Sequence, residues 1–381
     1  MPNKATIMLQ LFFFTTLLVS TGFGGCLEEQ QESDEEQILP IPVPIDVASV
    51  LPNWADGQYH DYGATVVKLN TFEDSFPELV DVFSIGKSNL GKDIWCIRLT
   101  NEENKQEKLS CLIDGCIHGN EWEAGDACLY IAEYLLINYG ANQTVTSILD
   151  EIAVYIVPLV NPDGRQQNTR WNANSIDLNR NFDVDFGRLR GHSLPLGKIF
   201  GRIEIPYLII PRFGSLTNAG RKPFSEPESQ AMKALMTNLV DEHFSFYINC
   251  HTAVHNFITP WSAFKPPFEI TSQEKNVFSY ARQWVATYTE YEDTPLSYSA
   301  SGTVTDWCFK EFHVPCFTFE LLSKEYEPWI HAGRHDHLVH WMNTTLPVFL
   351  YLFENTENLY QWEIPDNQPC LPEGVPPPPL H

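Results

Sequence analysis

Short apolar runs alternate with longer stretches of helical spacing along the middle of the chain. Four runs are apolar and bounded by polar residues, namely 111–113, 153–159, 245–249 and 316–321. The stretches 121–138 and 226–242 have the length and apolar spacing of helices. Because apolar strands of this kind are typical of sheets covered on both faces, we expect an α/β fold with a buried mixed sheet.

A potentially reactive side chain stands at or just after the end of each predicted strand. In α/β sheets, functional residues gather just beyond the carboxyl ends of the strands. The residues at these ends are His118, Asn161, His251 and Glu320. They are the first candidates for a functional site.

The first 25 residues resemble an export signal, because Lys4 is the only charge before an uncharged stretch rich in Leu and Phe. Small residues directly before Cys26 resemble a lipoprotein signal, in which that cysteine is lipidated after cleavage. Alternatively, the uncharged stretch 5–25 stays as a single anchor, since it is long enough to cross a hydrocarbon core of roughly 30 Å. We expect an exported chain that is held at the outer face of a membrane or secreted.

The ends of the chain have compositions that do not pack into a core. Residues 26–53 are acidic and then proline-rich, which predicts a semi-rigid stalk. Residues 356–381 include four consecutive prolines and read as a tail. A single folded domain is therefore expected over residues 54–355.

Composition narrows the classes of function. The chain carries 49 acidic and 24 basic residues, a formal net charge of −25, which argues against a nucleic-acid partner. The hydrophobic content of 43% is enough for one large core or two modest ones. Nine cysteines permit disulfides in an oxidising compartment without fixing their pairing. We expect a monomer.

Five sequence blocks, in the same order, make the chain resemble the zinc carboxypeptidase family. His118-x-x-Glu121 alone is a common pattern, and the other blocks give it its specificity. The resemblance covers about residues 54–353 and implies a mixed, twisted sheet sandwiched by helices, with one Zn²⁺ per chain. The other matching segments are 161–164 with 170–182, 250–252 with 259–260, 298–302 leading to 306–307, and 317–321.

The resemblance makes His118, Glu121 and His251 the zinc ligands and leaves a fourth position for water, as a catalytic zinc requires. Asp177 matches the residue that hydrogen-bonds a ligating histidine, here His118, and so fixes its tautomer.

The same resemblance assigns the reacting groups. Glu320 matches the general base that takes the proton of the water and delivers it to the leaving amine. Arg170 matches the arginine that binds substrate and stabilises the oxyanion.

Further matches concern substrate binding. Asn179 and Arg180 match the pair that binds the free carboxylate of the substrate, which implies exopeptidase activity. Tyr298 matches the mobile tyrosine that closes over the C-terminal residue. Thr305 stands at the position of the selector at the pocket floor, and the alternative selector position is Ser262. Because both are neutral, we expect release of neutral C-terminal residues.

The predicted function is therefore that of a zinc-dependent metallocarboxypeptidase acting on the C-termini of peptides or proteins. Two alternatives stay open. One is an amidohydrolase of the same superfamily that acts on acyl amino acids or peptidoglycan stem peptides. The other is a non-catalytic lipoprotein that keeps the zinc fold for binding.

Overall fold

The computed structural model describes residues 59–187, 218–252, 255–289, 291, 299–321 and 335–364, with the backbone alone for 335–344. The expected signal segment, the whole expected stalk with Cys26, Tyr298 and most of the expected tail lie outside these residues. Within the described residues, no helix has both the length and the apolar character needed to cross a membrane.

A single mixed sheet of seven strands forms the centre of the described domain. Its order is β1-β2-β4-β3-β5-β7-β6, in which β4, β3, β5 and β7 run parallel and the strands toward both edges pair antiparallel. This confirms the expected α/β fold with a mixed sheet. The strands are β1 Val80–Lys87, β2 Asp93–Leu99, β3 Leu109–Asp114, β4 Ile152–Val157, β5 Phe244–Thr252, β6 Asn256–Ile258 and β7 Cys316–Leu321.

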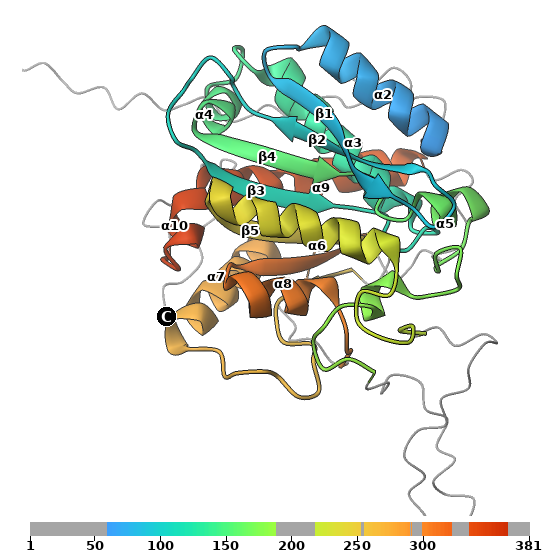
Figure 1. The fold of residues 1–381 in the computed structure, drawn as a ribbon. Coiled ribbons are helices and arrows are strands. Elements are labelled where there is room, and N and C mark those ends of the chain that lie inside the picture. Colours follow the sequence, from blue (N-terminus) through green and yellow to red (C-terminus); the bar gives the residue numbers. More distant parts are fainter. Residues whose placement is uncertain are drawn as a thin grey trace, which may run out of the picture. The chain divides into compact units, whose positions relative to one another are not determined.

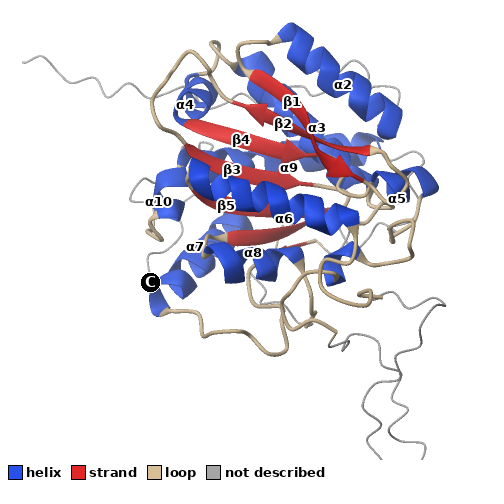
Figure 2. Ribbon diagram, viewed as in Figure 1, coloured by secondary structure: helices blue, strands red, loops and turns tan. Residues whose placement is uncertain are grey.

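Helices cover both faces of this sheet. In the view of Figures 1 and 2, α6 lies in front of the sheet, and α3 and α9 lie behind it. The described helices are α2 Tyr62–Ser75, α3 Trp122–Asn138, α4 Gln143–Glu151, α5 Pro162–Gln167, η1 Leu178–Arg180, α6 Pro227–Leu239, η3 Val240–Glu242, α7 Ser272–Tyr288, α8 Val304–Phe312, α9 His335–Glu354 and α10 Thr356–Tyr360.

The burial of the strands follows from this layering. Every residue of β4 and β5 is buried, whereas the edge strand β1 keeps exposed positions. An apolar strand of this kind needs cover on both faces. The pattern explains why the central strands could be predicted from their continuous apolar runs.

Ordered structure continues past residue 355, where a tail was expected. Leu359 of α10 is 3% exposed, and the indole nitrogen of Trp362 donates to the backbone oxygen of His313 at 3.0 Å. Because these residues pack on the domain, the described fold reaches Ile364. The proline-rich part of the expected tail lies outside the described residues.

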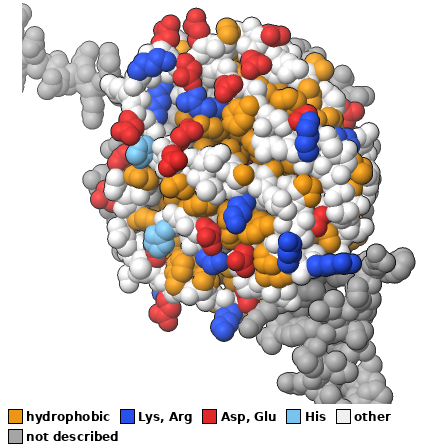
Figure 3. Space-filling model, viewed as in Figure 1, with side chains coloured by type: hydrophobic (Ala, Val, Ile, Leu, Met, Phe, Trp, Pro, Cys, Tyr) orange, Lys and Arg blue, Asp and Glu red, His pale blue; other side chains and the backbone are white. Residues whose placement is uncertain are grey.

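The face of the domain shown in Figure 3 carries interspersed acidic and basic side chains. On this face the excess negative charge of the chain is not gathered into one patch. This agrees with a solvated acidic surface.

The register of the parallel strands brings their carboxyl ends to one edge of the sheet. Asp114 pairs with Asn249 across β3 and β5, and His251 pairs with Glu320 across β5 and β7. The residues that follow β3, β4 and β5 therefore meet at the same edge, as the positions of the candidate residues require.

A buried carboxyl group joins two of these strands just below that edge. Asp114 is fully buried, and its Oδ2 accepts a hydrogen bond from the hydroxyl of Tyr247 at 2.6 Å. The amide of Asn249 donates to Oδ1. Burial raises the pKa of Asp114 to about 7, although these two hydrogen bonds act to lower it.

We predict that Asp114→Asn flattens the pH dependence of stability. A carboxyl whose folded pKa is raised contributes stability that is fully present below its unfolded pKa of about 3.9, and this stability is lost as the pH rises toward 7. An amide does not ionise in this range. Denaturant unfolding at pH 5 and pH 8, at one fixed zinc concentration, measures the difference.

The difference in unfolding free energy between the two pH values should shrink in this variant without vanishing, since burial also raises the pKa of Asp306 to about 7. Asp74→Asn, at an exposed position, is the matched control and should keep the parent's difference. An unchanged difference in Asp114→Asn would show that Asp114 does not carry this pH dependence.

Candidate active site

The loop after β3 carries two candidate residues, His118 and Glu121, at the edge of the sheet. Cys116 has a positive φ of 51°, and its thiol donates to the backbone oxygen of Glu121 at 3.0 Å. A Cβ atom on Gly119 would lie 2.0 Å from the backbone carbon of Gly164, so only glycine fits where this loop crosses the start of α5. The loop is thereby held between β3 and α3.

Asn161, the candidate at the end of β4, supports this loop. Its side-chain oxygen caps α5 by accepting from the backbone nitrogen of Gly164 at 2.9 Å. Its amide nitrogen lies 3.4 Å from the backbone oxygen of Ile117. Asn161 therefore has a structural place next to the site.

The three expected metal ligands lie together. The Nδ1 atoms of His118 and His251 lie 2.7 Å and 2.8 Å from the two carboxylate oxygens of Glu121. One ligand atom from each residue lies within 4.8 Å of the others, and all three side chains are buried. Two imidazoles and a carboxylate are a donor set that suits a catalytic zinc, so these residues fit the ion that the resemblance implies.

The charges in this cluster favour an ionised carboxylate. Burial acts to raise the pKa of Glu121, but the neighbouring His118 and His251 outweigh it and hold the pKa well below its usual range. Burial similarly opposes the ionisation of Asp177, and Arg170 and His118 again outweigh it, which lowers its pKa. The site thus contains two buried carboxylates held in their charged form.

Asp177 links the metal cluster to Arg170. Its Oδ1 lies 3.0 Å from Nε2 of His118, while its Oδ2 accepts from Nε and Nη2 of Arg170 at 3.0 Å and 2.9 Å. The remaining guanidinium nitrogen, Nη1, lies 3.2 Å from Nδ1 of His118. Asp177 thereby holds one side of the guanidinium, and the other side faces the expected ligand atoms.

Asn179 contacts the second histidine. Its Nδ2 lies 3.0 Å from Nε2 of His251, and its Oδ1 accepts from the backbone nitrogen of Val304 at 2.9 Å. Asp177 and Asn179 belong to one short turn at η1, because Asp177 also accepts from the backbone nitrogen of Asn179. One turn therefore reaches the outer nitrogens of both histidines.

Glu320 lies at the end of β7, opposite His251 in the register of the sheet. It is 7% exposed, and its Oε2 has no hydrogen-bond partner among the described residues. Burial, with a contribution from the charge of Glu121, raises its pKa to about 8. A carboxyl group in this position can accept a proton beside the metal cluster.

Arg180 lies beside this cluster at the other end of η1. Its Nη1 donates to the backbone oxygen of Asn179 at 2.6 Å, and the residue is 8% exposed. Gly302, with a φ of +69°, packs on the backbone of Arg180 so closely that a Cβ atom would lie 2.2 Å from its oxygen. The segment that leads into α8 is thus held against η1.

Thr305 lies in the first turn of α8, which begins directly after this segment. It is 4% exposed, and its hydroxyl lies 2.6 Å from the hydroxyl of Thr318 on β7. The neighbouring Asp306 accepts from the backbone nitrogens of Ser262 and Ala263 at 3.0 Å and 2.8 Å. Both selector positions considered from the sequence, Thr305 and Ser262, therefore adjoin Asp306.

Sequence reasoning missed two of these contacts. The approach of Asn179 to His251 spans 72 positions, and no local pattern indicates it. The role of Asp306 in holding the loop at Ser262 had a weak signal, since an acidic residue three positions after Thr303 is typical of the first turn of a capped helix. Nothing in that signal points to the distant loop.

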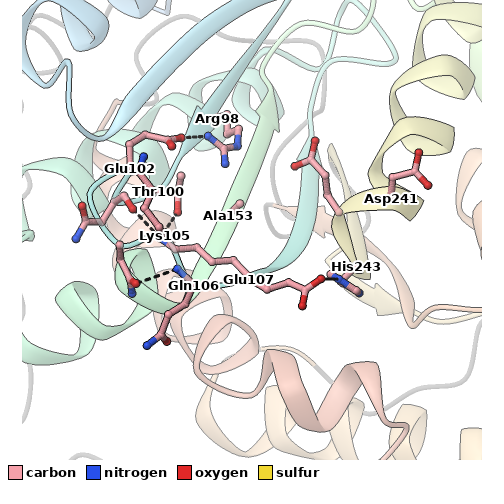
Figure 4. A pocket seen from close by; sticks show the side chains of 13 residues that line it. Arg98, Thr100, Glu102, Lys105, Gln106, Glu107, Ala153, Asp241 and His243 are labelled. Atoms are coloured by element: carbon pink, nitrogen blue, oxygen red, sulfur yellow. Dashed lines mark hydrogen bonds and ion pairs between the residues drawn. The ribbon is translucent and has the colours of Figure 1, made fainter. Parts of the chain in front are cut away.

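A hollow of about 300 Å³ lies away from this site (Figure 4). Its lining includes residues 100–102, 104–108 and 241–243, which precede β3 and β5, so it lies at the opposite edge of the sheet from the metal cluster. Arg98 pairs with Glu102, and His243 lies 2.6 Å from Glu107. The lining of the hollow contains no candidate residue.

Comparison with known proteins gives a consistent picture. The chain is similar to carboxypeptidase O of Bos taurus, with 21% identity over 338 residues that cover 82% of each chain. It is 23% identical to carboxypeptidase A4 of Mus musculus over 71% of this chain and 64% of that protein. It is 25% identical to metallocarboxypeptidase A of Trichophyton tonsurans over 69% of this chain and 63% of that protein.

Solved structures show the same fold. The crystal structure of thrombin-activatable fibrinolysis inhibitor matches 87% of this chain and 79% of its own, with a TM-score of 0.65 and 20% identity. That of carboxypeptidase A from Helicoverpa armigera matches 81% of this chain and 79% of its own, with a TM-score of 0.61 and 19% identity. The expected architecture is confirmed.

The sequence blocks, the fold and the cluster of His118, Glu121 and His251 all agree with a match of the zinc carboxypeptidase family model to residues 65–332. The chain belongs to the zinc carboxypeptidase family of zinc-dependent peptide hydrolases.

Proposed function

We propose that this chain removes the C-terminal residue of peptides or proteins by hydrolysis, with Glu320 as the general base. The observation that carries the proposal is the placement of Glu320 directly across the sheet from His251, with one carboxylate oxygen free of hydrogen bonds among the described residues. A base beside the proposed metal ligands can collect the proton that hydrolysis releases.

The proposed ligands are His118, Glu121 and His251, and we infer one zinc per chain. When bound, the ion supplies Lewis acidity that makes water acidic near neutral pH and polarises a peptide carbonyl. Glu320 takes the proton of the attacking water and passes it to the departing amine, so that the peptide bond breaks without a covalent enzyme intermediate.

Arg170 has the geometry of an oxyanion donor. Asp177 holds two of its nitrogens, and Nη1 faces the metal cluster. A positive charge fixed in advance at this point stabilises the negative oxygen that develops on the carbonyl, a type of contact typically worth about 10²–10³-fold in rate.

Cleavage at the end of a peptide requires recognition of the free carboxylate. Asn179 and Arg180 are the proposed binding pair, and they lie together beside His251 and the start of α8. A guanidinium group suits a planar carboxylate. Tyr298, outside the described residues, is the proposed tyrosine that closes over the bound residue.

The proposed place of action is outside the cytoplasm. This proposal rests on the uncharged N-terminal stretch and the small residues before Cys26, which serve as a lipoprotein signal or a membrane anchor.

The activity can be tested by incubating the full chain with a mixture of peptides and following the products by mass spectrometry. Loss of single residues from C-termini, abolished by a zinc chelator and restored by added zinc, is the expected result. Cleavage confined to acyl amino acids or peptidoglycan stem peptides would favour the amidohydrolase alternative. Intact substrates under all conditions would favour a binding protein.

We predict that Glu320→Gln keeps one zinc per chain and lowers kcat by about 10²–10⁴-fold, because the amide keeps the shape but cannot accept the proton. Metal analysis and turnover of an acyl-dipeptide measure the two effects. Glu311→Gln, at an exposed position, is the control and should leave both unchanged. Near-normal turnover in Glu320→Gln would mean that another group is the base.

We predict that the chain prefers neutral C-terminal residues, because the neutral side chains of Thr305 and Ser262 supply no counter-charge to a buried lysine or arginine head group. Thr305→Asp should raise kcat/KM for a substrate ending in Arg relative to one ending in Phe by about tenfold or more. The control, Thr305→Val, keeps the shape of the side chain and should retain the neutral preference.

Acyl-dipeptides ending in Phe, Leu, Arg and Glu provide the comparison. If the parent chain cleaves the Arg substrate fastest, the proposed preference is wrong. If Thr305→Asp leaves the ratio of Arg to Phe cleavage unchanged, then Thr305 is not at the pocket floor.

A further inference from the structure

The two histidines of the cluster face chemically opposite partners on their outer nitrogens. Nε2 of His118 faces a carboxylate oxygen of Asp177 at 3.0 Å, whereas Nε2 of His251 faces the amide nitrogen of Asn179 at 3.0 Å. A carboxylate oxygen only accepts a hydrogen bond, and an amide nitrogen only donates one. The same turn of the chain therefore treats the two rings differently.

The orientation of the Asn179 amide is determined by a second contact. Its Oδ1 accepts from the backbone nitrogen of Val304 at 2.9 Å, and Val304 is fully buried. If the amide were turned over, its nitrogen would face that N–H group, and a buried donor would lose its acceptor at a cost of about 1–3 kcal/mol. The nitrogen therefore belongs on the His251 side.

These contacts matter for a metal ligand. On both rings Nδ1 is the nitrogen that faces Glu121, and it is the one available to a metal. A neutral imidazole that binds metal through Nδ1 carries its proton on Nε2 and donates it to an outer acceptor. Asp177 provides that acceptor for His118, whereas Asn179 presents an N–H group to His251.

We infer that Asn179 is a positioning residue that weakens the binding of zinc by His251. Asp177, in contrast, strengthens the binding of zinc by His118. The inference rests on the proposed zinc ligands and goes beyond the proposed role of Asn179 in binding the substrate carboxylate. A carboxylate at residue 179 would give Nε2 of His251 a hydrogen-bond acceptor, but it would repel the substrate's carboxylate. Asparagine here favours substrate binding over zinc retention.

Asn179→Asp tests the inference, because one carboxylate oxygen can still accept from Val304 while the other accepts from Nε2 of His251. We predict that the full-length variant releases zinc to excess chelator at pH 8 about tenfold more slowly than the parent, a size typical of outer partners of metal ligands. Turnover should fall through a raised KM, since the new charge repels the substrate.

Two controls separate this effect from added charge and from misfolding. Asn168→Asp adds the same charge at an exposed position nearby and should release zinc at the parent's rate. In the zinc-loaded Asn179→Asp variant, proton NMR should show a new downfield imidazole N–H resonance, as expected for Nε2–H of His251 bound to a carboxylate. Circular dichroism and thermal unfolding establish that each variant is folded.

Zinc release by folded Asn179→Asp at the parent's rate or faster would overturn the inference. So would a parent chain that already shows the downfield resonance of His251, because His251 would then have an acceptor. Neither result depends on turnover. Failure of the proposed carboxypeptidase activity would instead appear as a parent chain that binds zinc and cleaves no C-terminal residue.

Discussion

The contact between Gly119 and Gly164 is the constraint on which the site depends. Two backbone segments meet there with no room for a Cβ atom, one from the loop after β3 and one from the first turn of α5. This contact fixes the path of the chain between His118 and Glu121, which are two of the three proposed ligands. A larger residue at Gly119 would separate the loop from α5, and the proposed ligand atoms would lose their common centre.

The third proposed ligand, His251, and the proposed base, Glu320, come from the sheet itself. His251 and Glu320 are paired residues of neighbouring parallel strands, so their separation is set by backbone hydrogen bonds. The turn at η1 adds Asp177 and Asn179 to the outer sides of the two rings. The centre thus combines rigid strands, a tightly packed loop and one turn, a construction that suits groups requiring fixed geometry.

The sequence indicated those parts of the structure that have a strong local pattern. The strands β3, β4, β5 and β7 were predictable because burial on both faces demands continuous apolar runs. The edge strands β1 and β2 and the three-residue strand β6 lack that pattern, and the shorter helices give weak periodic signals. The helix α10 was missed because the proline-rich composition that follows it dominates that region.

For the site, motif spacing indicated which residues come together but not what each one contacts. His118 and Glu121 are three residues apart, and a local loop is enough to join them. The contact of Asn179 with both His251 and Val304 depends on segments more than 70 positions away. Such contacts depend on how η1 lies against the end of β5 and the start of α8, which a single sequence does not encode locally.

The placement of Thr305 has an evolutionary consequence. It lies on α8, outside the sheet that holds His251 and Glu320, and its polar contact with the sheet is one hydroxyl pair with Thr318. Substitutions at this proposed selector position can therefore change the proposed substrate preference while His251 and Glu320 keep their geometry. A fold arranged in this way can acquire new substrate preferences through substitutions in one helix, because His251 and Glu320 lie on the sheet and not on that helix.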